Sequence, residues 1–177
     1  MNPETQQIKL TFNTTRDDYR IAWLTALAIT IHIVESALPS PLPGVKPGLA
    51  NVVTIVVMLM YGWPTAAWVA LLRVIVGSLI IGTFLTPTFV LSLSGAVASV
   101  IALGIGTWLP GKGLGPIGYC LIASMAHMAA QFTIAYLIFI PHAGLFKLLP
   151  VLMTAAVIFG IVSGIIVSAV MIRLSSR

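Results

Sequence analysis

Residues 64–82 of the chain read PTAAWVALLRVIVGSLIIG, and this stretch decides the fold class. It is a predominantly apolar run of about 20 residues, the length that crosses a hydrocarbon core of roughly 30 Å as an α-helix. Pro64 suits the first turn of such a helix, where its missing N–H costs nothing. The single charged residue of the run, Arg73, lies near the middle. We therefore predict a transmembrane helix that carries one ionisable side chain in its central turn.

The composition of the whole chain also indicates that lipid surrounds the protein. Of its 177 residues, 59% are apolar and 7% are charged, and the mean hydropathy is +1.08. Soluble domains are about 25% charged, so the composition excludes a soluble globular protein. The apolar sequence between residues 21 and 174 has room for six crossings.

Joints rich in proline and glycine separate the crossings. The second crossing is only about fourteen residues long, so we expect it to tilt or to begin inside the bilayer. The fold class is therefore all-α, a polytopic bundle of six transmembrane helices. We predict a polar cytoplasmic tail over 1–19, a transmembrane domain over 20–174 and a C-terminal tail over 175–177. The expected helices are 20–38, 48–61, 64–82, 89–109, 117–140 and 149–172.

Basic residues indicate the orientation. The side that holds both termini carries six, and the other side carries Lys46 and Lys147, so the positive-inside rule places the N- and C-termini in the cytoplasm. The net charge of +5 is scattered along the chain, which gives no nucleic-acid-binding patch. The six are Lys9, Arg16, Arg20, Lys112, Arg173 and Arg177.

Ionisable residues inside a membrane are few and informative. Each costs about 2.5–3.5 kcal/mol at mid-bilayer on insertion scales. Arg73 is one of them, and Glu35 with His32 lies on one face of the first helix because of the three-residue spacing. Arg73 has three possible roles: it binds an anion, it pairs with Glu35, or it snorkels to an interface.

The fifth helix carries a polar stripe formed by Ser124, His127 and Gln131, with Cys120 one turn earlier. Such a stripe faces protein or a cavity. Interhelical hydrogen bonding, ligand contact and proton transfer are the three alternatives.

Small residues also recur at four-residue spacing, which lets helices approach closely. We expect these pairs to support packing within the bundle. They are Ala22 and Ala26, Ala66 and Ala70, Ala126 and Ala130, and Gly160 and Gly164.

The sequence argues against an enzyme. Prenyl diphosphate synthesis needs aspartate-rich clusters that hold Mg²⁺, and the chain has four acidic residues, of which only Asp17 and Asp18 are adjacent. It has no P-loop, and its one cysteine, Cys120, provides no cluster of thiolates. We expect no metal and no cofactor.

Three segments carry a family resemblance. They are PGVKPGLANVVT over 43–54, Arg73 with Gly77 and Gly82, and SLSGAVAS over 92–99. Together they resemble the bacterial membrane family called Gx transporters, which is also described as heptaprenyl diphosphate synthase component I. That family is similar to the S components of energy-coupling-factor importers. The chain departs from the family pattern at Pro47, and at Met128 and Ala130 of the fifth helix.

The resemblance implies a substrate-binding protein of the bacterial inner membrane that takes up a small anionic or amphipathic molecule. The candidate contacts to that substrate are Lys46, Asn51 and Arg73, followed by Glu35, His127 and Gln131. Ala22 and Ala26 match the helix face that docks the transmembrane coupling subunit, which works with energy-coupling ATPases. The alternative is a non-catalytic membrane subunit that docks a prenyl diphosphate synthase or a membrane redox complex. A third hypothesis, an intramembrane enzyme that uses His127 or Glu35 as a base, has the least support.

Overall fold

The computed structural model describes residues 15–37, 49–108 and 114–175, and this part of the chain folds into six α-helices in the predicted order. A π-helical turn η1 (Ala135–Phe139) extends α5, and a 3-10 helix η2 (Ala143–Lys147) precedes α6. The all-helical prediction is confirmed. The α-helices are α1 (Arg16–Ala37), α2 (Leu49–Tyr61), α3 (Trp63–Ile81), α4 (Pro87–Thr107), α5 (Pro116–Ile134) and α6 (Leu149–Ser175).

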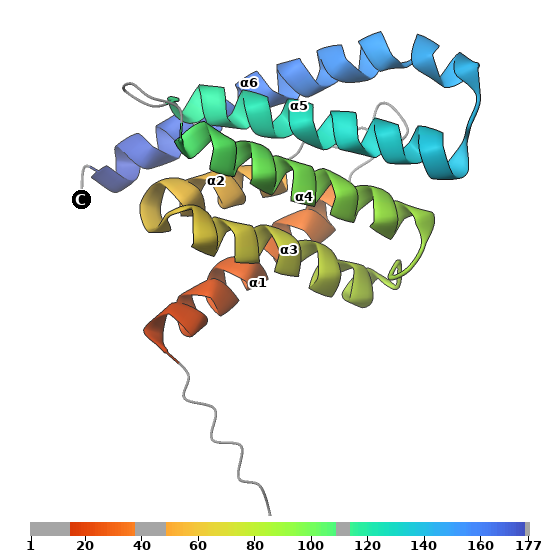
Figure 1. Cartoon of the computed structure of the whole chain (residues 1–177). Coiled ribbons are helices and arrows are strands. Elements are labelled where there is room, and N and C mark those ends of the chain that lie inside the picture. Colours follow the sequence, from red (N-terminus) through yellow and green to blue (C-terminus); the bar gives the residue numbers. More distant parts are fainter. Residues whose placement is uncertain (1–14, 38–48, 109–113, 176–177) are drawn as a thin grey trace, which may run out of the picture.

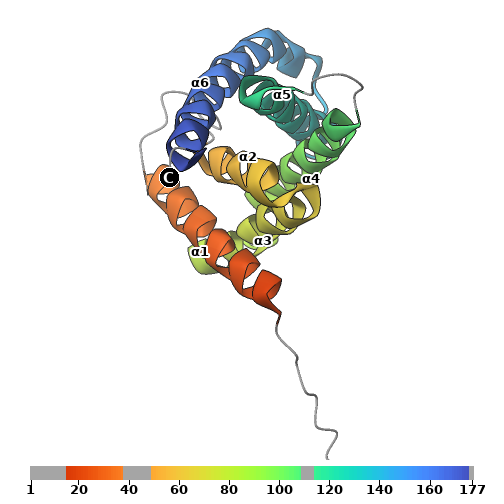
Figure 2. The same cartoon turned by 90° about the vertical axis from the view of Figure 1, so that its left-hand side faces the viewer.

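The helices lie roughly antiparallel, and the start of α1 and the end of α6 are at the same end of the bundle (Figure 1). Viewed along the bundle, the other five helices surround α2 (Figure 2). The main core cluster follows from this position, because Val53, Ile55 and Val57 of α2 are all buried in it. α2 packs against α1, α3, α5 and α6, and α3 and α5 in turn pack against α4.

Among the described residues, four segments are long and apolar enough to cross a membrane: α3, α4, Pro116–Phe139 and α6. The predicted short second helix is confirmed, because α2 has 13 residues and spans only about 20 Å. α1 is not among the four segments that are long and apolar enough to cross a membrane, and its first turn carries the acidic residues Asp17 and Asp18. The architecture is that of a multi-pass membrane protein.

The first helix begins earlier than the sequence analysis placed it, at Arg16 rather than Arg20. The cause is a capping box. The backbone N–H of Thr15 donates to Asp18 Oδ2 at 2.7 Å, and the backbone N–H of Asp18 donates to Thr15 Oγ1 at 3.3 Å. Both bonds satisfy donors that a helix start leaves open. The last residues of the predicted polar tail are therefore helical.

α5 and α6 meet through glycines. A Cβ at Gly164 would lie 2.6 Å from Ile117 Cα, and one at Gly160 would contact Ser124 Oγ. The prediction that this small-residue pair supports packing within the bundle is confirmed. Ala66 and Ala70 are also buried, whereas Ala22 and Ala26 are exposed on α1.

The joint between α3 and α4 is short and well defined. Gly82 and Leu85 adopt left-handed conformations, with φ of 77° and 61°, a region that strains a side chain such as leucine. Thr86 caps α4 by accepting a hydrogen bond from the Phe89 N–H. This end of the α3–α4 hairpin is therefore held by its own backbone geometry.

Candidate functional site

Arg73 lies in the middle of α3 and is 5% exposed, so it belongs to the bundle interior. Snorkelling toward an interface is thereby excluded. Its Nη2 donates a hydrogen bond to Asn51 Oδ1 of α2 at 3.3 Å. Two residues predicted as substrate contacts are therefore neighbours, 22 positions apart in sequence.

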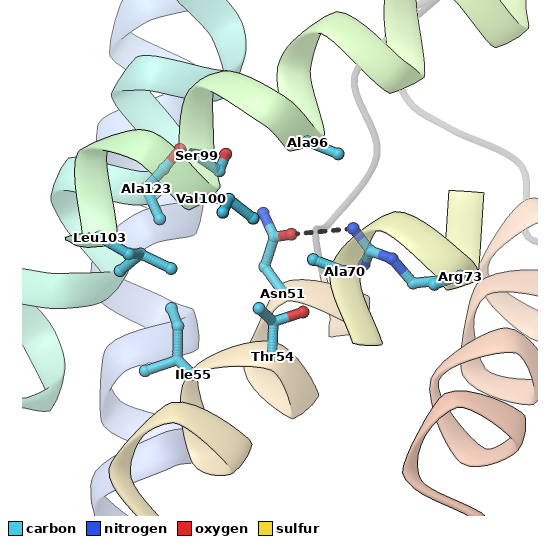
Figure 3. A pocket seen from close by; sticks show the side chains of 10 residues that line it. All are labelled: Asn51, Thr54, Ile55, Ala70, Arg73, Ala96, Ser99, Val100, Leu103 and Ala123. Atoms are coloured by element: carbon cyan, nitrogen blue, oxygen red, sulfur yellow. Dashed lines mark hydrogen bonds between the residues drawn. The ribbon is translucent and has the colours of Figure 1, made fainter. Parts of the chain in front are cut away.

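A small cavity adjoins this pair (Figure 3). Its volume is about 10 Å³, which is room for about one water molecule. It lies where α2, α3, α4 and α5 meet. Its walls come equally from the two halves of the chain: Asn51, Thr54, Ile55, Ala70 and Arg73 from α2 and α3, and Ala96, Ser99, Val100, Leu103 and Ala123 from α4 and α5.

The walls combine one strongly polar side with small side chains. Ala70, Ala96 and Ala123 each present only a methyl group to the space. Ser99 Oγ donates to the Ala123 carbonyl oxygen at 2.9 Å, which ties α4 to α5. The guanidinium of Arg73 is the charged group of the lining, so the cavity suits a polar or anionic group beside that cation.

His127 lies one turn of α5 beyond the cavity wall, against Gly95 of α4. A Cβ at Gly95 would come within 2.7 Å of the His127 ring. Its Nδ1 is buried and has no hydrogen-bond partner in the part of the chain that the structure describes. The ring also lies within electrostatic range of Arg73. His127 is thus a neighbour of the Arg73 site and outside the cavity lining.

The other members of the polar stripe on α5 do not converge there. Ser124 Oγ donates to the Leu121 carbonyl oxygen at 3.0 Å within its own helix, so this hydroxyl donor does not make the interhelical hydrogen bond that was one of the three alternatives for the stripe. Gln131 is half-buried one turn beyond His127. Cys120 is buried in the core cluster around α2.

The remaining residues that the sequence singled out lie away from the cavity or outside the part of the chain that can be described. Lys46 lies outside the described residues, as does the side chain of Glu35, whose backbone is in α1. His32 of α1 packs against α3, because a Cβ at Gly77 would lie 3.5 Å from its Cδ2. Sequence reasoning missed Thr54 and Ser99. Thr54 had a signal, since it follows Asn51 by three residues and shares its helix face.

Comparison with known proteins gives a family for the chain and no individual relative. No curated protein and no solved structure matches the chain. The family described as heptaprenyl diphosphate synthase component I matches residues 24–170, which include the cavity and all six helices in whole or in part. The chain belongs to the heptaprenyl diphosphate synthase component I family.

Proposed function

We propose that this protein is a membrane-embedded binding subunit, of the S-component type, that takes up a small anionic or amphipathic molecule. The observation that carries the proposal is the buried Arg73 beside a cavity at the junction of four helices. A guanidinium in the interior of a membrane bundle is costly, and such residues commonly mark substrate or ion pathways. Asn51 orients it from α2 through the 3.3 Å hydrogen bond.

The ligand class follows from the chemistry of the lining. Arg73 offers planar donors that match a carboxylate or phosphate, and Asn51 and Thr54 add neutral polar groups. The rest of the wall is aliphatic, which suits an apolar ligand body. Because the cavity has the volume of one water, a larger ligand requires the surrounding helices to separate.

An ion pair with Glu35 is the competing explanation for the buried charge of Arg73. A pair between Arg73 and Glu35 would be neutral and would require no ligand. Lys46 and Gln131 are further contacts in the binding proposal, and His127 adds a buried ring nitrogen next to the site. Variants of Arg73 and Glu35 distinguish ligand binding by Arg73 from an ion pair with Glu35.

The direct test is native mass spectrometry of the tagged protein, purified in mild detergent from its natural host. We expect an organic anion to be retained by the parent protein and lost from the Arg73→Ala and Lys46→Ala variants. Arg173→Ala is the matched control, because Arg173 is an exposed arginine in the last turn of α6. Unchanged retention by folded Arg73→Ala would reject the proposal, and Glu35→Gln would then test the ion pair by its effect on stability.

A second candidate function is favoured by the family description. That description names a component of a heptaprenyl diphosphate synthase, which implies protein partners in a multi-subunit assembly. In this alternative the chain docks a prenyl diphosphate synthase or a membrane redox complex at the bilayer and does no chemistry itself. Co-purification of such a partner with an empty bundle would favour this function.

Partner docking in the transport proposal is assigned to α1. Ala22 and Ala26 are exposed and lie one turn apart on the same face, where a second helix could approach closely. The energy-coupling ATPase and transmembrane subunits would dock there. We expect Ala22→Leu and Ala26→Leu to abolish co-purification of those subunits and leave ligand retention intact.

The location follows from charge. The described end that holds the start of α1 and the end of α6 carries Arg16, Arg20 and Arg173, whereas Lys147 lies at the other end. The positive-inside rule then supports cytoplasmic termini in a bacterial inner membrane. A fusion reporter at each terminus, active only in the cytoplasm, would test this orientation.

A further inference from the structure

Trp63 joins α3 to α4 at the end opposite their covalent joint. Its indole Nε1 donates a hydrogen bond to the Val100 carbonyl oxygen at 2.8 Å. The ring also lies against Gly104, where an added Cβ would come within 2.8 Å of Nε1. The contact crosses from the first half of the chain to the second.

Along α3, the cavity lies between this contact and the α3–α4 joint. Along α3 the order is Trp63, then Ala70 and Arg73 of the lining, then Gly82 at the joint. Along α4 the lining extends from Ala96, on the joint side of Val100, to Leu103, on its other side. The capped backbone of residues 82–86 holds one end of the hairpin, and the indole contact holds the other.

The α4 turn that Trp63 covers is also part of the cavity wall. Val100, whose carbonyl oxygen accepts the indole hydrogen bond, lines the cavity, and so does Leu103, the neighbour of Gly104. Trp63 itself is 38% exposed, so the same ring reaches from the cavity wall to the surface. It lies at the bundle end where α1 begins and α6 ends.

We propose that Trp63 is the gate of the Arg73 cavity. Release of the indole from Val100 lets α3 and α4 separate at that end and connects the cavity with the membrane surface there, while the joint at 82–86 acts as the pivot. This inference rests on the proposed function, which places this end of the bundle in the cytoplasm. It adds the route by which a bound molecule leaves Arg73 for that side, and the residue that controls this route.

The test measures opening without any ligand. In a Cys120→Ala background, Ser99→Cys places a single thiol in the cavity wall, and methyl methanethiosulfonate is the probe. Two variants release the gate: Trp63→Phe keeps a ring and removes the N–H donor, and Gly104→Ala displaces the indole. We expect each to raise the rate of thiol modification about five-fold, as the loss of one hydrogen bond implies.

Two matched variants serve as controls. Trp108→Phe changes an indole that is 88% exposed, and Gly115→Ala adds a methyl group where no atom lies within 4 Å. Both should leave the rate unchanged. Equal rates in Trp63→Phe and the parent would overturn the gate, as would an equal rise in Trp108→Phe.

General loosening of the bundle is excluded by a second reporter. Val167→Cys in the same background places a thiol in α6, where the side chain is fully buried away from the cavity lining. Its modification must stay slow in Trp63→Phe, and a parallel rise would also overturn the gate. If Ser99→Cys does not fold, Ala96→Cys reports from the same wall. Because no ligand is involved, a negative result removes the gate and leaves the ligand contact of Arg73 to be judged by mass spectrometry.

Discussion

Arg73 in the centre of α3 and Asn51 in the first turns of α2 share one hydrogen bond, from Nη2 to Oδ1 at 3.3 Å. The bond joins the middle of α3, which is long enough to cross the membrane, to the first turn of α2, which is too short to cross it. The acceptor is a neutral amide, so the bond orients the guanidinium without neutralising its charge.

Asn51→Asp replaces that amide with a carboxylate. If the charge of Arg73 serves a ligand, we expect the new pair to raise stability by about 1 kcal/mol and to abolish retention of the anion. If Glu35 already neutralises Arg73, the second carboxylate is an uncompensated buried charge and stability falls. Thermal unfolding in detergent at neutral pH measures the sign. Asn51→Leu is the control, because it removes the acceptor without adding charge.

Gly95→Ala is expected to displace the His127 ring, because the added methyl would lie 2.7 Å from it. Overpacking of this kind costs about 1–3 kcal/mol. The double variant Gly95→Ala with His127→Ala should recover most of that loss, since the clash is removed. Unfolding by sodium dodecyl sulfate in mixed micelles measures both. No loss in the single variant would show that the ring has room to move.

The two glycines of α6 should respond differently to alanine. At Gly164 the new methyl meets the Ile117 backbone at 2.6 Å, which cannot move aside, whereas at Gly160 it meets the Ser124 hydroxyl. We expect Gly164→Ala to destabilise by about 1–3 kcal/mol and Gly160→Ala by less. Ser124→Gly should rescue Gly160→Ala and leave Gly164→Ala unchanged. The same rescue at both positions would contradict the packing described for α5 and α6.

The cap of α1 predicts a pH dependence. Hydrogen bonds from the backbone N–H and then the hydroxyl of Thr15 lower the pKa of Asp18 below its usual value. A lowered folded pKa means that the cap stabilises α1 above the unfolded pKa and loses this effect as the pH falls through the folded pKa. Carboxyl carbon chemical shifts of the protein in micelles measure that pKa. Thr15→Ala should raise it only in part, because the backbone N–H donor remains.

The spanning helices could be predicted closely because one physical signal decides them. An apolar run of about 20 residues with proline at its start predicts a spanning helix, and both ends of α3 lie within one residue of that prediction. The start of α1 was missed because a Thr15-x-x-Asp18 pair within a polar tail was treated as tail, although it forms a capping box. The continuation of α5 as a π-helical turn to Phe139 also has no sequence signal of this strength.

Only the most polar part of the cavity lining was predicted from the sequence. Arg73 and Asn51 stand out in an apolar sequence, because a buried polar group in lipid is rare and costly. Ala96 and Ala123 do not stand out, because alanine is common in every helix of such a bundle. Their contribution depends on which helices face each other, and so does the meeting of His127 with Gly95. A single sequence holds no record of those pairings.

The central position of α2 has a consequence for biosynthesis. Its 13 residues are too few for stable insertion as an independent crossing, yet two of the helices it packs against, α5 and α6, are made later. When the ribosome has completed α3, two of the four helices that α2 packs against do not yet exist. We therefore expect α2 to reach its final depth only after the last helix leaves the translocon, so that assembly of this protein finishes at its centre.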